Sequence, residues 1–407
     1  MNSRALMVTV LIVAMGCAGC GEGLERSSSI GEPKRLIAQF DALGAKGKRR
    51  ALQDSIARGR AYLLEHQNAD GSFSTGRNAK GFNILRPLPG SHTSMQVAVT
   101  ALSVSALIET SGRDDGVAAK AIDKACAFLL DRLPTTRRDH PMVLYNCWSG
   151  AYGLEALASL HRWYDGDAVK QKAIDTVIAQ QISYMARYEA VNGGWSYLDL
   201  KNKTAKPSPH TTCFTTAAIL QAFHDVKLLG HHIPARLVER GVKVILRQRN
   251  PDWTFVYSDG FSLKFSAVDP GSRMPSTLGR SVACALVLRL WSPRHAKPTI
   301  VPMLVDRLIR KNVWLSRARK TQRPHESFFH VAGYYYYFGH YYAARALPQL
   351  PAADRAKVAS DLAALLVPKQ EPDGSWWDYP LYDYHWFYGT GFCLRSLQRC
   401  LNELPAE

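Results

Sequence analysis

Histidines recur in the segments that lead into the second helix of each predicted helix pair, in four of the six pairs. His92, His210, His330 and His385 occupy equivalent places in four such segments. Imidazole nitrogens bind transition metals, so two or three of these side chains with a carboxylate would form a metal site. The four residues are therefore candidate metal ligands, although they lie in separate segments and no local ligand motif connects them.

The same segments offer a proton-transfer chemistry instead. His330 or His385 would act as a general acid or base, with Asp383 beside His385 as a further candidate, and Arg273 would hold an acidic substrate. The N-termini of the following helices add unpaired N–H groups and a positive dipole, which favour anions. The alternative for each of them is a structural role, in which the side chain caps a helix or hydrogen-bonds to a neighbouring loop.

The densest aromatic run lies near the C-terminus, over residues 334–342. Several of its residues share one helical face and, with aromatic residues further along, would form a wall for an isoprenoid tail, a sugar ring or a cation. The predicted ligand-binding residues are Tyr334, Tyr337, Phe338, Tyr341, Trp386 and Tyr388. Aromatic packing inside the core is the alternative.

These candidates lie on a repeating framework. A short turn opened by Asp or Asn recurs at intervals of about 60 residues or twice that, which is typical of one copied supersecondary unit. The clearest copies begin at Asp70, Asn192, Asp252 and Asp373. The spacing predicts further copies near Asp131 and Asn312.

Each interval contains two predicted helices. The first helices are amphipathic: Ser55–Gln67, Ala118–Leu133, Ala168–Tyr188, Pro234–Arg249, Pro298–Lys311 and Ala353–Lys369. The second are richer in small residues and apolar on nearly every side: Thr93–Thr110, Trp148–Tyr164, Thr211–Leu229, Ser276–Trp291, His330–Leu347 and Gly389–Leu401. A helix that is apolar all round is buried, so we predict an all-α fold, an α/α toroid of six hairpins with the second helices inside. An open solenoid is the alternative.

The turn residues resemble those of a known family. Gln67–Phe73 and Gln370–Trp376 resemble the QW repeats of the squalene cyclase and prenyltransferase superfamily, and the last unit, with Tyr388–Thr390, resembles the final repeat of squalene–hopene cyclases. This resemblance implies a terpenoid cyclase-like toroid over residues 51–402. The chain has neither the DxDD acid of the cyclases nor the Asp-x-Cys zinc pair of the prenyltransferases, so the resemblance implies the scaffold without either activity.

The formal charge of +17 favours an acidic partner such as anionic lipid, polyuronate or another cell-wall polymer. The 46% hydrophobic content and 21% charge are ordinary for a globular chain with a substantial core. The basic residues are scattered and form no recognisable nucleic-acid-binding motif, so we expect no nucleic-acid partner and a monomer.

The N-terminus is typical of an export signal. Arg4 precedes the apolar run Ala5–Met15, and Cys17–Cys20 resembles a lipoprotein processing box in which Cys20 is acylated. We therefore predict an export signal over 1–20, a polar tether over 21–50 and a lipid-anchored protein in the periplasm or on the cell surface. Plain cleavage by signal peptidase is the alternative. The other cysteines are predicted to be small buried hydrophobes: Cys126, Cys147, Cys213, Cys284, Cys393 and Cys400.

The sequence leaves three functions open, and with them the choice between an enzyme and a binding protein. The first is a toroid that binds an isoprenoid or another apolar or stacking ligand in its central cavity. The second is a glycan-active enzyme, a polysaccharide lyase or hydrolase, and the third a non-catalytic envelope scaffold. A deep apolar cavity would favour the first function, and an open groove with paired carboxylates or with Arg beside Tyr would favour the second. A filled centre would favour the third.

The mass of the denatured protein tests the predicted anchor. We expect a chain that starts at Cys20 and carries acyl groups, because processing precedes this cysteine in lipoproteins. A Cys20→Ser variant should lack the added mass, whereas Cys126→Ser should keep it. A wild-type mass equal to the unmodified polypeptide would contradict lipidation.

Overall fold

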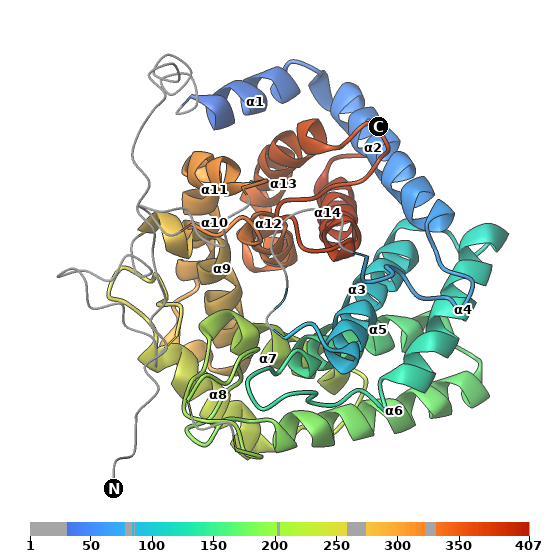
Figure 1. Ribbon diagram of the computed structural model, residues 1–407. Helices are drawn as coiled ribbons and strands as arrows, with labels where there is room; N and C mark the ends of the chain where they lie inside the picture. The colour runs from blue at the N-terminus through green and yellow to red at the C-terminus, as the bar shows by residue number, and fades with distance from the viewer. Residues whose placement is uncertain are drawn as a thin grey trace, which may run out of the picture.

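The computed structural model describes residues 31–77, 84, 86–201, 204–258, 274–321 and 331–406. Within these residues the helices form two concentric rings (Figure 1). The inner ring consists of α3 (Pro89–Thr110), α5 (Asn146–Trp163), α7 (Cys213–Lys227), α9 (Met274–Trp291), α12 (Tyr335–Arg345) and α14 (Tyr384–Glu403). The outer ring consists of α2 (Gly44–Glu65), α4 (Gly116–Arg132), α6 (Ala168–Arg187), α8 (Ala235–Arg247), α10 (Ile300–Arg310) and α13 (Ala352–Leu366).

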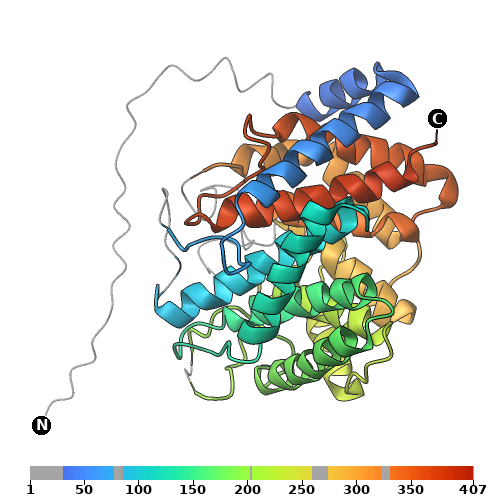
Figure 2. The ribbon, with the colours of Figure 1, turned by 90° about the vertical axis from the view of Figure 1, so that its right-hand side faces the viewer.

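The inner ring is closed. Each inner helix packs against the next one along the chain, and the last, α14, packs against the first, α3 (Figure 2). The inner helices are buried along most of their length, as their apolar and small residues predict. The predicted α/α toroid with inner and outer rings is therefore confirmed, and the open solenoid is excluded.

The structure differs from the predicted tether. α1 (Glu32–Asp41) and the start of α2 lie in that segment, and α1 packs against α13 through the buried side chains of Leu36 and Phe40. The Lys369 ammonium lies 2.5 Å from a carboxylate oxygen of Glu32. The apolar spacing of Leu36 and Phe40 on one helical face is the signal that the tether prediction overlooked.

Two of the predicted turns are wrong. Asp131 lies inside α4, and Asn312 begins the short helix α11 (Asn312–Ala318). The Asn312 side chain is buried, and its Nδ2 lies 2.8 Å from Nε2 of His340. An Asx turn needs this side chain to bond its own backbone, so the contact with His340 replaces the turn.

The two Asp-Gly turns, at Asp70 and Asp373, have the predicted geometry. The backbone N–H of Ser375 donates to Oδ1 of Asp373 at 2.9 Å, and Gly374 between them has a φ of +91°. The first copy is equivalent, with Ser72 N–H donating to Asp70 Oδ1 at 3.0 Å. Asx-Gly is therefore used for the reason expected, since Gly tolerates a positive φ and Asp bonds its own backbone.

The glutamines that precede two turns link neighbouring units. Nε2 of Gln67 donates to the carbonyl of Gly71 at 3.0 Å and to the carbonyl of Ala121 on α4 at 2.8 Å. Nε2 of Gln370 donates equivalently to Gly374 and, at 2.9 Å, to Ser55 on α2. The last unit is thereby joined to the first, which closes the outer ring.

A buried threonine joins the turn to the inner helix. In three units the backbone N–H of the turn aromatic donates to a threonine Oγ1 at 2.9 to 3.0 Å; the pairs are Phe73 with Thr100, Trp195 with Thr216, and Trp376 with Thr390. In the fourth unit Arg280 on α9 replaces the threonine, and its Nε donates to the carbonyl of the turn residue Phe255 at 2.8 Å. Four inner helices are thus fixed to the turns through these side chains.

The six cysteines of the described residues are buried and form no disulfide, as predicted; they are Cys126, Cys147, Cys213, Cys284, Cys393 and Cys400. In the described part of the chain, none of the helices has the length and apolarity that a membrane crossing requires.

The Gly374→Val substitution tests the turn. A Cβ at Gly374 would lie 2.6 Å from the Arg58 carbonyl oxygen, on a backbone with positive φ, so we expect a loss of more than about 2 kcal/mol of unfolding free energy. Gly116→Val is the control, because a Cβ there meets nothing within 4 Å and φ is not positive. Equal denaturation midpoints for the two variants would contradict the assignment.

Candidate functional site

The segments that enter the inner helices meet at one face of the ring, which we call the mouth. Among the described residues, backbone N–H hydrogen bonds join five of the six pairs of neighbouring segments: Ser91 N–H to Asp139 Oδ2, Asp199 N–H to the Met142 carbonyl, Cys213 N–H to the Tyr257 carbonyl, Lys320 N–H to the Asp378 carbonyl, and Thr75 N–H to Asp383 Oδ2. The predicted convergence of these segments is confirmed for their described residues.

Five of these segments each contribute a tyrosine to one group at the mouth, the tyrosine cluster. Its members are Tyr145, Tyr197, Tyr257, Tyr334 and Tyr379. The hydroxyls of Tyr197 and Tyr257 are hydrogen-bonded, and the Tyr257 hydroxyl lies 3.4 Å from that of Tyr334. These three side chains are partly exposed. Burial raises the pKa of Tyr334 to about 12 and that of Tyr197 still further, so the phenols are neutral at pH 7.

Aromatic side chains fill the axis below the tyrosine cluster. Phe338 on α12 packs against Phe214 on α7 and Phe392 on α14, with centroids 6.3 and 6.2 Å apart. Tyr152 on α5 meets Phe392 edge-on at 5.5 Å, and Trp148 stacks on Phe214 at 5.9 Å. These helices are not all neighbours in the ring, so their side chains meet across the axis.

A charged network crosses the axis further from the mouth. Glu155 on α5 accepts hydrogen bonds from the Tyr341 hydroxyl and from Arg345, both on the opposite helix α12. Nη2 of Arg395 on α14 lies 2.8 Å from the same carboxylate. Burial alone would raise the pKa of Glu155, but Arg395 and Arg345 outweigh it and hold the pKa well below its usual range.

The described catalytic candidates have structural partners. Asp383 accepts from the Ser74 hydroxyl at 2.5 Å and, through Oδ2, from the backbone N–H and the hydroxyl of Thr75 at 2.7 Å, which ties the last loop to the first. His385 is 3% exposed, and its Nδ1 accepts from the Leu381 N–H at 3.2 Å. Burial lowers the pKa of His385 to about 4, so this imidazole is neutral at pH 7.

The predicted metal ligands do not form a cluster in the described residues. Nδ1 of His92 lies 2.5 Å from the Tyr384 hydroxyl, and His210 is buried with its backbone N–H bonded to the Ser208 carbonyl. Across the described ranges no group of three or more His, Cys, Asp or Glu side chains is placed to hold a metal ion. Arg273 and His330, like Cys20, lie outside the described residues.

The structure separates the predicted ligand-binding residues. Tyr334 lies in the tyrosine cluster, and Trp386 and Tyr388 are partly exposed. The Tyr388 hydroxyl lies 3.3 Å from the carbonyl of Tyr379, a member of that cluster. Tyr337, Phe338 and Tyr341 are 0, 5 and 0% exposed and pack inside the ring. α12 begins at Tyr335, so Tyr334 precedes the helix and leaves the face that the helical spacing assigned to it.

The sequence prediction missed Asp378. This side chain is fully buried, and it accepts from the Tyr388 hydroxyl at 2.8 Å and from the Tyr337 backbone N–H at 3.1 Å. Burial raises the pKa of Asp378 to about 7.

Repeat register was the signal that could have found the missed residues. Tyr197, Tyr257 and Asp378 each stand two residues after a turn aromatic, at Trp195, Phe255 and Trp376. In these three units the residue at this position takes part in the contacts at the mouth.

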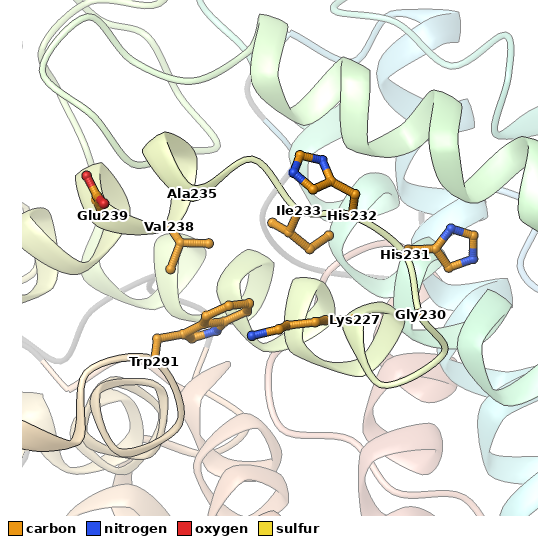
Figure 3. Close-up of a pocket in the computed structure, with 9 residues that line it drawn as sticks. All are labelled: Lys227, Gly230, His231, His232, Ile233, Ala235, Val238, Glu239 and Trp291. Carbon is orange, nitrogen blue, oxygen red and sulfur yellow. The ribbon is translucent and has the colours of Figure 1, made fainter.

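A separate surface hollow of about 530 Å³ lies between α7, α8 and α9 (Figure 3). The Lys227 ammonium lies 4.9 Å from the ring centre of Trp291, and Ile233 and Val238 point toward the same space. His231 points away from the hollow, and its Nε2 lies 3.0 Å from Asp175 Oδ1. These side chains do not converge on a common point, so we place no chemistry there.

Comparison with known proteins adds the fold alone. No family model and no curated protein matches the chain. An α-1,6-mannanase from Salegentibacter sp. HEL1_6 is 10% identical over 86% of this chain and 99% of its own, with a TM-score of 0.54. A cellobiose 2-epimerase from Spirochaeta thermophila is 14% identical over 93% of this chain and 98% of its own, with a TM-score of 0.52.

A type II terpene cyclase from Scytonema also matches, at 14% identity over 88% of this chain and 99% of its own, with a TM-score of 0.49. All three identities are too low to show more than the architecture. The chain therefore has an α/α toroid fold of the kind found in the mannanase and the epimerase.

The buried Asp378 carboxyl predicts a pH-dependent stability. Folding raises the pKa of this carboxyl, so its ionisation lowers the free energy of unfolding. This destabilisation is absent below about pH 4 and grows as pH rises toward 7. Asp378→Asn mimics the protonated carboxyl and should therefore stabilise the protein more at pH 8 than at pH 5. Urea unfolding at both pH values measures this, with Asp131→Asn as the control at an exposed aspartate. A stability change independent of pH would contradict the raised pKa.

Proposed function

We propose that the mouth binds a segment of a glycan chain on the tyrosine cluster. The observation that supports this most directly is the meeting of the Tyr197, Tyr257 and Tyr334 hydroxyls, which come from three different units. A neutral phenol both donates and accepts hydrogen bonds, and its ring offers an apolar face. Sugars present the matching combination of hydroxyls and C–H faces.

The charge of the protein favours an anionic glycan such as a polyuronate. The net charge is +17. Near the mouth, the Arg280 guanidinium lies 5.7 Å from the ring centres of both Tyr257 and Tyr335, and the Lys320 ammonium lies 4.3 Å from Trp377. Lys320 also pairs with Glu371 at 2.6 Å and Arg280 is 1% exposed, so the net charge of the chain, rather than a single exposed cation, supports an anionic ligand.

An isoprenoid ligand, which the QW turns favoured, is less consistent with these contacts. A long apolar chain needs a chamber along the axis, whereas Phe214, Phe338 and Phe392 meet there and the Glu155 network crosses below them. The filled axis is the feature expected of the non-catalytic envelope scaffold, and a scaffold that binds glycan at its mouth is consistent with both the filled axis and the tyrosine cluster. Kinship with the squalene cyclase and prenyltransferase repeats remains our proposal for the scaffold. The mannanase and the epimerase provide an analogy for glycan chemistry on this architecture.

We also propose that the protein acts outside the cytoplasm, anchored through Cys20, where cell-wall and extracellular glycans are accessible. Cleavage of the glycan would require a proton donor, and the partly exposed Tyr388 hydroxyl, bonded to Asp378, is the best-placed candidate among the described residues.

Binding assays with defined polysaccharides test the proposal. We expect the protein to bind polygalacturonate more tightly than neutral mannan, with Tyr257→Ala weakening the affinity by about tenfold or more, equivalent to about 1.4 kcal/mol. The matched control is Tyr164→Ala, because this tyrosine lies at the C-terminal end of α5, away from the mouth. The same samples are assayed for new reducing ends and for unsaturated products. Undiminished binding by Tyr257→Ala, or no binding to any glycan tested, would contradict the proposal.

A further inference from the structure

The axis of the ring also opens at the end opposite the mouth. A pocket of about 570 Å³ lies there, lined by the C-terminal halves of α3, α5, α7, α12 and α14. Most of the side chains at its base are charged, and they include the Glu155 network. We call it the far pocket.

The acidic groups of the far pocket are each paired with arginine. Glu109 lies 2.7 Å from Arg395 and 3.0 Å from Arg399. Asp225 accepts two hydrogen bonds from Nη2 of Arg345, at 2.7 and 3.0 Å, and Glu155 is shared by Arg345 and Arg395. Three carboxylates thus balance three guanidinium groups.

Two further arginines line the far pocket without a carboxylate partner among the described residues. Arg113 donates to the carbonyls of Trp163 and Arg162, at 2.7 and 2.8 Å, and Arg162 donates to the carbonyl of Ala158 at 3.2 Å. Both side chains are exposed. The side chains that line the pocket therefore carry two more positive than negative charges, partly offset by the carbonyl ends of the inner helices.

Hydrogen-bond donors are in excess at the same place. Nη1 of Arg395 and Nε of Arg399 are buried and have no hydrogen-bond partner in the described part of the chain. Arg395 as a whole is 2% exposed. Unpaired guanidinium N–H groups beside an open, positively charged pocket favour an acceptor that brings negative charge, and a planar guanidinium fork suits a tetrahedral oxyanion.

We propose that the far pocket binds a phosphate group carried by a compact molecule. A phosphate dianion would neutralise the charges of Arg113 and Arg162, and the pocket volume leaves room for a small ester beyond the phosphate. The pocket is separated from the mouth by the aromatic side chains on the axis, so this site is independent of glycan binding.

Calorimetric titration with inorganic phosphate at constant ionic strength tests the proposal, together with sedimentation on phosphatidylcholine vesicles that contain phosphatidic acid. We expect saturable binding in one of the two assays, weakened at least tenfold in the Arg113→Gln, Arg162→Gln double variant. Arg294→Gln, an exposed arginine outside the pocket, is the matched control and should bind like wild type. Because both substituted side chains are exposed, the double variant should melt like wild type.

Binding of inorganic phosphate assigns the site to a soluble phosphate ester, whereas binding of vesicles alone assigns it to a lipid headgroup. Saturable binding in neither assay, or equal binding by wild type and the double variant, would overturn the proposal.

Discussion

The arrangement of the whole ring depends on the buried ion pairs that cross its axis. Glu155 on α5 contacts Arg345 on α12 and Arg395 on α14, and these arginines continue to Asp225 on α7 and Glu109 on α3. Each charge is expensive to bury unless it is paired, so removing one partner leaves an uncompensated charge in the core. The pairs therefore fix which inner helices face one another.

This network, with the aromatic layer above it, divides the ring into two ends of different chemistry. At the mouth, neutral phenols and backbone turns from successive units come together. At the far end, arginines gather around the C-termini of the inner helices, where unpaired carbonyls and the helix dipole favour cations. A small number of cross-axis contacts thus converts a repeated hairpin into a structure with two distinct surfaces.

Local patterns predict the repeat well and the site poorly. Apolar periodicity separates inner from outer helices, and Asx-Gly fixes the turns at Asp70 and Asp373, because these signals depend on neighbouring residues only. Pairing of Glu155 with Arg345 joins residues 190 positions apart, and no local pattern encodes it. The sequence prediction placed Tyr334 and Tyr337 on one helical face, but α12 begins at Tyr335. Periodicity alone does not fix the first residue of a helix to within one or two positions.

Native mass spectrometry of the protein purified from its own membranes, compared with the same sample after denaturation, tests the central claim that side chains occupy the axis. The account predicts the polypeptide with its N-terminal acyl groups and either no further mass or that of a glycan or phosphate ester. A stoichiometric isoprenoid or other long hydrocarbon, retained in the native state and released on denaturation, would contradict it.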